Sequence, residues 1–264
     1  MAVSHWKEFH QRWSRLGPPL RPNAEVVEAI RSLLANRMRR VLLLGVTPEL
    51  ADLGTEVIAV DRNEAMIAHV WPGDTGQRRA ERGDWLALPF PGGHFSAAIG
   101  DGSLNILTFP DGPQALYAQL DRVLEAGGVF VARVFMAPDV AESVLDVRDE
   151  TKAGRIRSFH AFKWRLAMAI VADARDPNVK VTTIRDVFNH EFPDRAALSS
   201  WTGWHPDDIA TIDVYRDSPE VYNFPTAGQL HAVIPGSFGN LRTLPVGTYE
   251  LAERCPLVIV ERRA

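Results

Sequence analysis

Short apolar runs, each followed by a polar or glycine-containing turn, divide the first half of the chain. The runs VLLL and VIAV are four residues long and end in Gly45 and Asp61. Continuous runs of this length, rich in Val, Ile and Leu, are typical of parallel strands that are covered on both faces. We expect weaker third and fourth strands in RRAERGDW, ending near Asp84, and in FSAAIGDG, ending near Gly100, and a fifth in VFVARVF.

Amphipathic stretches lie between these runs. Asn23 is placed to cap a first helix. The apolar positions of this helix fall on one face: Val26, Val27, Ile30, Leu33 and Leu34. A short helix is expected over 64–70, and another begins near Pro113 and ends at Gly127. Five strands that alternate with helices over 41–135 imply right-handed crossovers and a parallel sheet with helices on both faces.

The rhythm changes beyond Phe135. Helix-like patterns cover 140–152 and 160–174. The region up to Trp204 is rich in aromatic side chains: Phe159, Phe162, Trp164, Phe188, Phe192 and Trp201. They form either an ordinary helical core or a cap over an apolar or aromatic substrate, and both interpretations stay open. Near the end, a run around 240–252 and the strand PLVIVER are close enough to form an antiparallel hairpin on the sheet edge.

Composition narrows the classes of function. At 264 residues and 46% hydrophobic, the chain can bury a large core. Its formal net charge of −4 provides no overall basic field for a nucleic-acid backbone, so no nucleic-acid partner is expected. Cys255 is the one cysteine, which excludes an internal disulfide and a cysteine zinc cluster. The polar start MAVSHWKEFHQRW and the lack of 18 uninterrupted apolar residues predict a cytoplasmic protein with no membrane partner.

Four motifs, in their order and spacing, resemble one enzyme family. They are VLLLG, the acid-ended strand VIAVD, the pair Asp84 and Trp85 after the third strand, and the junction RVLEAGGVFVARVF. Over positions 41–135 they resemble the class I S-adenosylmethionine-dependent methyltransferases, and the terminal hairpin is similar to that family's antiparallel addition to its sheet. The resemblance implies S-adenosyl-L-methionine as cofactor and S-adenosyl-L-homocysteine as its product.

The fold that the resemblance implies is α/β. It is a Rossmann-like, doubly wound, mostly parallel seven-stranded sheet with a C-terminal antiparallel hairpin and a helical cap insertion. We expect a single domain over 1–264. Within it, an arm and a helix take up 1–35, the cofactor-binding core 36–135, a cap or substrate region 136–222, and the last part of the sheet 223–264.

The resemblance also implies a cofactor site at the strand ends. Gly45 would lie beside the methionine part of the cofactor, with Thr47 in the same turn. Asp61 would accept both ribose hydroxyls, which suits a carboxylate because it takes two donors at once in charge-assisted bonds. Asp84 would receive the adenine amino group, and Trp85 would cover the ring. The structural alternatives are a turn or capping role for Asp61 and a packing role for Trp85.

Further candidates follow the second and fourth strands. Arg62 and Met66, just past Asp61, would flank the other face of the adenine. Small residues in IGDGSLNIL let a backbone approach a ligand closely, and the family places the methionine moiety and the acceptor near this strand end. The candidates there are Gly100, Asp101, Gly102 and Ser103. Asp101 would contact the ammonium group of the cofactor or the acceptor, and the alternative for the whole segment is a plain tight turn.

The turn after the first strand departs from the family's pattern. Where the family usually has a glycine-rich loop, Gly45 is followed here by Val46, Thr47, Pro48 and Glu49. The cofactor has no pyrophosphate, so the three-glycine loop of dinucleotide folds is not required. Because Pro48 suits a first helical turn, Thr47 a cap and Glu49 the positive end of a helix dipole, we expect a short helix.

Other functions compete with this one. A nicotinamide dehydrogenase also has an acid after its second strand, but the three-glycine fingerprint is missing, and no Tyr is followed four positions later by Lys. The sequence has no Gly-x-Ser-x-Gly elbow of a serine hydrolase and no His-Glu-x-x-His pattern, so we predict no metal. The main alternative is a non-catalytic methyltransferase-like module that binds a ligand or a protein. The altered first loop favours it, whereas the retained Asp61 and Asp84 disfavour it.

We therefore expect methyl transfer to a small-molecule acceptor beneath the cap. No catalytic residue is named, because the sulfonium is already a good leaving group and positioning does most of the work. Exocyclic amines of nucleic acids and glutamine are disfavoured acceptors, since this chain has Gly102, Ser103 and Leu104 where that branch of the family carries two prolines and an aromatic. The arm with Trp13, Arg15 and Arg21 either folds over the cofactor, pairing an arginine with the cofactor's carboxylate, or faces solvent. The oligomeric state stays open.

Overall fold

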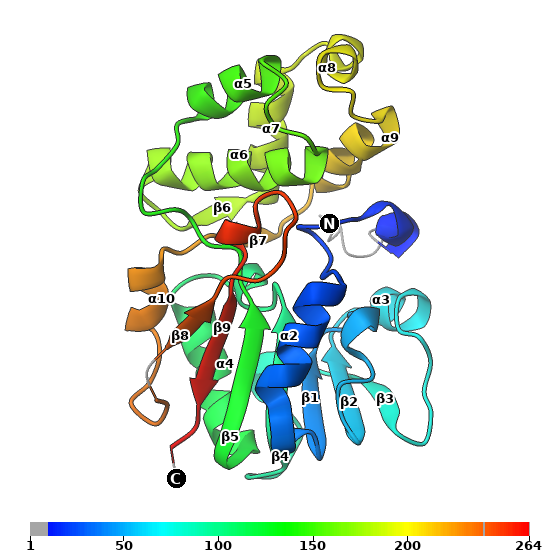
Figure 1. The fold of residues 1–264 in the computed structure, drawn as a ribbon, viewed down its shortest axis with the longest axis vertical. Helices are drawn as coiled ribbons and strands as arrows, with labels where there is room; N and C mark the ends of the chain where they lie inside the picture. The colour runs from blue at the N-terminus through cyan, green and yellow to red at the C-terminus, as the bar shows by residue number, and fades with distance from the viewer. Residues whose placement is uncertain (1–9, 240, 264) are drawn as a thin grey trace.

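A seven-stranded sheet forms the centre of the structure, a computed structural model that describes residues 10–239 and 241–263 (Figure 1). Its strands are β1 (Arg40–Leu44), β2 (Glu56–Asp61), β3 (Arg78–Arg82), β4 (Phe95–Asp101), β5 (Leu124–Arg133), β8 (Arg242–Leu244) and β9 (Leu257–Glu261). They lie in the order β3-β2-β1-β4-β5-β9-β8. Strands β1 to β5 are parallel, and β9 is antiparallel to β5 and β8, which confirms the predicted fold class. Most of the polar start lies in residues 1–9, outside the described residues.

Helices cover both faces of this sheet (Figure 1). One face carries α2 (Ala24–Leu34) and α3 (Glu64–His69). The opposite face carries α4 (Asp111–Val123) and α10 (Ala227–Ala232). Each face buries its own cluster of apolar side chains, as continuous apolar strands of a parallel sheet require. The doubly wound arrangement predicted from the sequence is confirmed.

Strand β1 shows how one apolar run serves both cores. Val41 and Leu43 pack on the α2 side of the sheet, and Leu42 and Leu44 pack on the α4 side. All four are buried. The alternation follows from the two-residue period of a strand. A run with no polar position is therefore needed here, and the strand ends where the first glycine allows a turn.

A helical cap lies beyond the carboxyl ends of the strands, at the top of Figure 1. Its helices are α5 (Val144–Lys152), α6 (Phe159–Ala174), α7 (Val181–Glu191), α8 (Arg195–Thr202) and α9 (Pro206–Ile209). A small antiparallel sheet of β6 (Asn178–Lys180) and β7 (Val221–Asn223) lies between the cap and the main sheet. The two expected helices are present as α5 and α6. Among the described residues, no helix is both long and apolar enough to cross a membrane.

The aromatic residues of the cap divide into two groups. Phe159, Phe162, Phe188 and Trp204 pack on one another with ring centroids 5.2 to 5.9 Å apart. All four are buried, so this group is the cap's own core. Trp164 belongs to a second group that lines a cavity beside the sheet. The interpretation as a helical core thus holds for the first group, and a substrate beneath the cap stays a prediction.

Two boundaries differ from the prediction. The helix expected to end at Gly127 ends at Val123, and β5 begins at Leu124. The Gly127 amide donates to the Arg262 carbonyl at 3.0 Å, so this glycine belongs to the irregular start of a strand rather than to a helix cap. The short helix expected after β1 is a single 3-10 turn over Pro48–Leu50. Both errors have the same cause, because turn residues indicate a break in the chain without fixing which element ends there.

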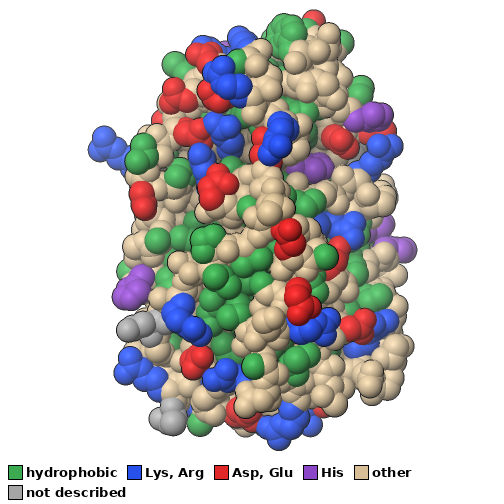
Figure 2. Space-filling model, viewed as in Figure 1, with side chains coloured by type: hydrophobic (Ala, Val, Ile, Leu, Met, Phe, Trp, Pro, Cys, Tyr) green, Lys and Arg blue, Asp and Glu red, His purple; other side chains and the backbone are tan. Residues whose placement is uncertain are grey.

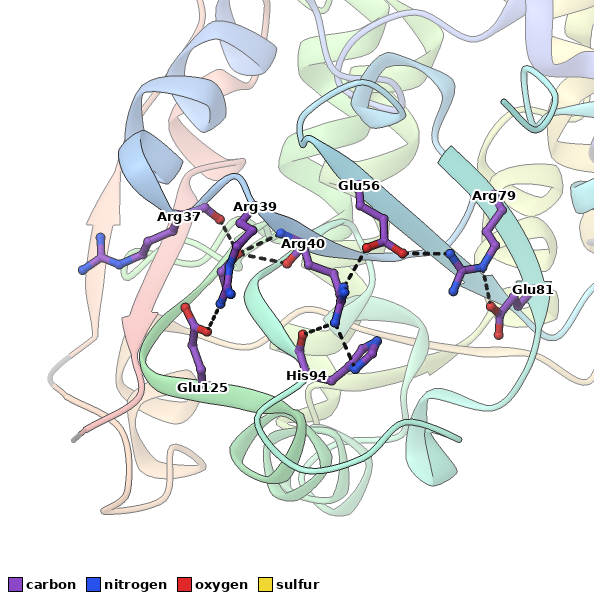
Figure 3. A network of polar contacts seen from close by, with 9 residues as sticks. Arg37, Arg39, Arg40, Glu56, Arg79, Glu81, His94 and Glu125 are labelled. Atoms are coloured by element: carbon purple, nitrogen blue, oxygen red, sulfur yellow. Dashed lines mark hydrogen bonds and ion pairs between the residues drawn. The ribbon is translucent and has the colours of Figure 1, made fainter. Parts of the chain in front are cut away.

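Charged side chains are paired across the amino ends of the strands (Figure 3). Arg40 of β1 donates to Glu56 of β2 at 2.7 Å, and Arg79 of β3 donates to the same carboxylate at 2.9 Å. On the face that Figure 2 shows, Lys and Arg side chains are likewise interspersed with Asp and Glu. Exposed pairs contribute only about 0–1 kcal/mol each. This network covers the amino ends of the strands, whereas loops and the cap meet at the carboxyl ends.

Candidate functional site

The carboxyl ends of the central strands surround a cavity of about 190 Å³, which we call the strand-end cavity. It lies where the sheet order reverses, because β2 pairs with one edge of β1 and β4 with the other. Ligands of doubly wound sheets bind at such points. The cavity brings together eight of the residues predicted from the sequence: Gly45, Thr47, Asp61, Arg62, Met66, Asp84, Trp85 and Asp101.

Gly45 ends β1 and shapes the floor of the strand-end cavity. Its φ of +99° is a backbone conformation that favours glycine, and its amide donates to the Val60 carbonyl at 2.9 Å. A Cβ added here would stand 3.8 Å from Cζ2 of Trp85 and 4.0 Å from Oδ2 of Asp61. The absent side chain therefore leaves open the space between the carboxylate and the indole.

Asp61 presents a carboxylate to this space. Its Oδ1 accepts a hydrogen bond from the Asn63 amide at 2.8 Å, which fixes the turn after β2. Burial raises the pKa of Asp61, although the nearby backbone amides and Arg62 oppose the shift. The Asn63 side chain caps α3 by accepting from the amides of Ala65 and Met66. The turn and the helix cap thus hold the carboxylate at the edge of the cavity.

Trp85 forms a flat wall of the strand-end cavity. Its indole Nε1 donates to the Val60 carbonyl at 2.6 Å, which ties the ring to the end of β2. Asp84 is exposed and caps the 3-10 turn Trp85–Ala87, because its Oδ1 accepts from the Leu86 amide at 2.9 Å. Asp84 therefore has a structural task in addition to any contact with a ligand. Trp85 is only half-buried, so its ring is accessible from the cavity.

Three other predicted residues border the same cavity. Thr47 and Met66 are buried and contribute small and apolar surface. Arg62 is exposed, and its guanidinium donates to Glu220 at 3.2 Å, across the gap to the segment before β7. The charge of Arg62 is thereby balanced by a residue of the cap region. The cavity wall on this side consequently includes a link between the sheet and the cap.

The segment after β4 lies partly outside the strand-end cavity. Of the residues predicted there, Gly100, Gly102 and Ser103 are not among the described residues that line the strand-end cavity. A Cβ on Gly100 would stand 2.3 Å from Oγ of Ser103, and one on Gly102 would stand 2.9 Å from a ring carbon of Phe135. Gly100 and Ser103 therefore pack the end of β4, whereas Gly102 lines a neighbouring cavity.

Asp101 is held by a buried arginine. The Arg133 guanidinium donates from Nε to Oδ1 of Asp101 at 2.5 Å and from Nη2 to Oδ2 at 2.9 Å. Arg133 is completely buried, and its Nη1 also donates to the Tyr249 hydroxyl at 3.2 Å. Although burial lowers the pKa of Arg133, the charge of Asp101 and these hydrogen bonds outweigh that effect and raise it. Asp101 is thus a fixed, paired carboxylate between β4 and β5.

The N-terminal arm lies against the strand-end cavity. Trp13, in the 3-10 helix His10–Arg15, lines it. The Arg21 guanidinium stacks 5.2 Å from the centre of the Trp13 ring and donates to the Trp13 carbonyl at 3.1 Å. Arg21 also donates from Nε to Glu49 at 2.8 Å. The arm therefore lies against the cavity rather than facing solvent. Two of its arginines pair with acids of the protein, Arg21 with Glu49 and Arg15 with Asp207, so the pairing with the cofactor's carboxylate stays a prediction.

Some lining residues were not among the candidates from the sequence. Asn63 borders the cavity, as do Leu86, Ile106 and Leu107. Asn63 had a detectable signal, because it directly precedes the expected helix at 64–70 and is a preferred capping residue. The apolar residues had no such signal, since the sequence does not distinguish an apolar loop residue that lines a cavity from one that packs into a core.

A sequence comparison identifies the family of the central region. The model of a family described as "Methyltransferase domain" matches residues 45–132, from Gly45 to the end of β5. Residues 45–132 are a methyltransferase domain. The resemblance to class I S-adenosylmethionine-dependent methyltransferases is thereby confirmed, and this family implies S-adenosylmethionine as the cofactor. No curated protein sequence matches the chain.

Solved structures share the fold of the methyltransferase domain and its cap. A protein of Rhodobacter sphaeroides, named as a zinc-dependent alcohol dehydrogenase, covers 100% of both chains at 14% identity with a TM-score of 0.63. A S-adenosylmethionine-dependent methyltransferase of Thermotoga maritima covers 98% of this chain and 99% of its own at 16% identity, with a TM-score of 0.52. Another, of Mesorhizobium loti, covers 89% and 96% at 19% identity, with a TM-score of 0.51. At these identities the likeness shows the fold alone.

The acids of the methyltransferase domain and the cap are not grouped as metal ligands. Over residues 10–239 and 241–263, no cluster of three or more His, Cys, Asp and Glu side chains could hold a metal ion. Asp61, Asp84 and Asp101 each line the strand-end cavity, but they lie at the ends of three different strands. Each of the three carboxylates has its own hydrogen-bond partner in the protein, which suits three separate ligand contacts rather than one shared metal ion.

A second cavity, of about 90 Å³, adjoins the strand-end cavity, and we call it the aromatic cavity. It lies between the end of the methyltransferase domain's sheet and the cap. It is lined by Leu20, Asp101, Gly102, Asn105, Ile106, Phe135, Lys163, Trp164, Tyr215, Tyr222 and Phe224. Asp101 and Ile106 line both cavities, so the two meet at the end of β4.

Proposed function

We propose that this protein binds S-adenosylmethionine in the strand-end cavity and transfers its methyl group to a small molecule. One observation carries the proposal. The Asp61 carboxylate and the Trp85 ring flank an open space that a side chain at position 45 would fill. A nucleoside needs this combination, since its ribose offers two hydroxyl donors and its base offers a flat apolar face.

Each lining residue has a defined part in this proposal. Asp61 accepts hydrogen bonds from both ribose hydroxyls, because a carboxylate oxygen can take more than one donor. Trp85 covers one face of the adenine, and Met66 with Arg62 borders the other. Asp84 accepts the adenine amino group with the oxygen that its capping bond leaves available. Gly45 and Thr47 lie beside the methionine part.

Methyl transfer mainly requires that the protein hold the methyl donor and the acceptor in the correct positions. The cofactor supplies a methyl group on a sulfonium, which is already a good leaving group. The chain's own residues hold the two reactants in line and exclude water. The Asp101–Arg133 pair makes the junction of the two cavities rigid, because both partners are buried and joined by two bonds. Trp13 covers one side of the strand-end cavity.

The acceptor in this proposal is a small molecule rather than a polymer. The aromatic cavity beside the methyl donor site has a volume of about 90 Å³ and is bounded by the cap. Its rings and apolar side chains suit a ligand that is buried on several sides. A nucleic-acid or protein chain would need a groove that continues past the site.

The experiment that tests the proposal is calorimetric titration of the purified protein with S-adenosylhomocysteine, with NADH titrated in parallel. Saturable binding of S-adenosylhomocysteine alone supports the methyltransferase. Saturable binding of NADH alone would instead favour a dehydrogenase. If neither ligand binds, the altered turn after β1 marks a module that has lost its cofactor, and the proposal fails.

A further inference from the structure

One loop of the methyltransferase domain forms part of the wall of both cavities. It covers 104–109, after β4, and begins with the 3-10 turn Leu104–Ile106. Ile106 and Leu107 line the strand-end cavity, and Ile106 also lines the aromatic cavity. The position of this loop therefore helps to set the shape of the cavity that the proposed function assigns to the methyl donor.

An asparagine outside the methyltransferase domain binds two carbonyl groups of this loop. Asn223, the last residue of β7, donates from Nδ2 to the Leu104 carbonyl at 2.7 Å and to the Leu107 carbonyl at 2.5 Å. Asn223 is only 1% exposed. Because each bond holds one side of the segment that carries Ile106, a single side chain fixes the backbone before and after this residue.

A second asparagine of the small sheet binds the end of the loop. Asn178, the first residue of β6, accepts from the Phe109 amide through Oδ1 at 2.8 Å and donates from Nδ2 to the Phe109 carbonyl at 2.9 Å. Two bonds to one residue reproduce the pairing of neighbouring strands. Asn178 is half-buried, so this contact is closer to solvent than that of Asn223.

The loop in turn donates a hydrogen bond to the small sheet. Asn105 is buried and donates from Nδ2 to the Asn223 carbonyl at 2.7 Å and to the Phe135 carbonyl at 2.8 Å. Its Oδ1 accepts from the Phe135 amide, just past the end of β5, at 3.0 Å. The loop, the small sheet and the end of β5 are thus joined by hydrogen bonds in a buried region, where an unmade bond is costly.

We propose that Asn223 is a positioning residue for the methyl donor. By holding the carbonyls of Leu104 and Leu107, it keeps Ile106 and Leu107 against the cofactor and couples cofactor binding to the small sheet beneath the cap. The role toward the cofactor rests on the proposed function, whereas the clamp on the loop does not. Because coupling between two sites is reciprocal, a ligand in the strand-end cavity stabilises β6 and β7 in return.

Asn223→Ala tests this role, with Ser96→Ala as the matched control. Ser96 is also buried and also bonds to the backbone of two residues, since its hydroxyl donates to the Arg37 carbonyl at 2.8 Å and accepts from the Arg40 amide at 3.1 Å. These bonds lie at the opposite end of the sheet. We expect both variants to unfold at lower urea concentration, and only Asn223→Ala to weaken S-adenosylhomocysteine binding, by about fivefold or more in calorimetry. Equal affinities in the two variants would overturn the positioning role.

A double-variant cycle tests whether Asn223 acts through the loop. Leu107→Ala shortens a side chain that lines the cavity and leaves the Leu107 carbonyl in place. We expect Asn223→Ala to weaken S-adenosylhomocysteine binding by a smaller factor in the Leu107→Ala protein than in the wild type, since the same contact is already lost. Equal factors in the two backgrounds would overturn the inference.

A half-buried variant keeps the test valid if Asn223→Ala does not fold. Asn178→Ala then takes its place and removes both bonds to Phe109. Asn178→Asp keeps an acceptor for the Phe109 amide, so it should recover part of the S-adenosylhomocysteine affinity that Asn178→Ala loses. Wild-type affinity in Asn178→Ala would contradict a role of the small sheet in shaping the cofactor cavity.

Hydrogen exchange separates this inference from the proposed function. Without ligand, the amides of 104–109 should exchange faster in Asn223→Ala than in the wild type or in Ser96→Ala. Saturating S-adenosylhomocysteine should protect the amides of β6 and β7 in the wild type and not in Asn223→Ala.

The two proposals fail in different ways. If the wild-type protein does not bind S-adenosylhomocysteine, the proposed function fails and the positioning role with it, whereas faster exchange of 104–109 in Asn223→Ala still supports the clamp. If S-adenosylhomocysteine binds, and Asn223→Ala changes neither its affinity nor the exchange of the loop, the inference is overturned and the methyltransferase proposal stands.

Discussion

The Arg21 guanidinium binds the Glu49 carboxylate and so joins the N-terminal arm to the turn after β1. Both side chains are largely buried, with 26% and 20% of their surface exposed. The same arginine stacks on Trp13, which lines the strand-end cavity. The turn after β1, which lacks the usual glycines, thus provides the acid Glu49 that holds the N-terminal arm against the cavity.

Breaking this anchor should destabilise the protein and weaken ligand binding. Arg21→Met leaves Glu49 partly buried without its charge partner, and we expect a loss of about 1–3 kcal/mol in the free energy of unfolding. S-adenosylhomocysteine should bind several-fold more weakly, since Trp13 loses its contacts with Arg21. Arg15→Met is the control, because the Arg15–Asp207 pair is half-exposed and contributes about 0–1 kcal/mol. Urea unfolding and calorimetry would measure both, and equal losses in the two variants would contradict the anchor.

A side chain at position 45 should damage the cavity as well as the backbone. Gly45→Ala places a Cβ between Asp61 and Trp85 at a φ of +99°. Gly73→Ala is a matched control, because Gly73 has a φ of +94° and nothing lies within 4 Å of its added Cβ. We expect both variants to lose about 1–2 kcal/mol of stability, and only Gly45→Ala to lose S-adenosylhomocysteine affinity. Equal affinities in the two variants would place the ligand elsewhere.

Much of this fold follows from local patterns in the sequence. The strands ending at Gly45 and Asp61 were predictable because both of their faces are buried, which forces continuous apolar runs. Asn23 was recognised as a cap, and its Oδ1 accepts from the Val26 amide at 3.1 Å. The position of Asp61 and Trp85 beside one cavity followed from the resemblance to a family, since the ends of parallel strands meet at one edge.

Contacts between distant parts of the chain could not be predicted in the same way. Arg21 and Glu49 are 28 positions apart, and Asp101 and Arg133 are 32 apart. Nothing in the sequence distinguishes these arginines from the exposed ones. Likewise, Lys163 lies in a helix whose residues are buried nearly all round, so the pattern of the helix did not show which side faces a cavity.

Removing one partner of the Asp101–Arg133 pair should lower the free energy of unfolding more than replacing both partners together. Arg133→Met leaves a buried carboxylate without its partner, so we expect a loss of about 3–5 kcal/mol. The double variant with Asp101→Asn should be less destabilised than Arg133→Met alone, because no lone buried charge remains. Urea unfolding of both single variants and the double variant gives the coupling energy. Additive losses would show that the two residues act independently.

Protein stability should decline as the pH falls from 6.5 to 4 because of His160. The imidazole donates from Nε2 to the Arg15 carbonyl, and burial followed by the charge of Lys163 lowers its pKa to about 4. Because the pKa of His160 is lower in the folded protein, the unfolded chain binds the proton more readily. The contribution of His160 to the free energy of unfolding is therefore complete above pH 6.5 and is lost as the pH falls towards 4. The full difference is about 3 kcal/mol.

His160→Gln should therefore flatten the dependence of the unfolding free energy on pH between 6.5 and 4.5. His94→Gln is the control, since burial and Arg40 also lower the pKa of His94, but this side chain is half-exposed at the opposite end of the sheet. Carboxylates whose pKa is lowered by arginines, such as Asp213, lose their contribution only below their ordinary values near 4. A slope that His160→Gln leaves unchanged would assign the effect to other groups.

The most direct test of the account compares S-adenosylhomocysteine binding by Asp61→Ala and Asp173→Ala. Asp173 is an exposed acid in the last turn of α6, so its loss should leave both the fold and the affinity unchanged. Asp61 accepts two charge-assisted hydrogen bonds in our account, and its loss should weaken binding by at least about tenfold. If the two variants bind S-adenosylhomocysteine equally well, Asp61 does not hold the ribose, and the strand-end cavity is not the cofactor site.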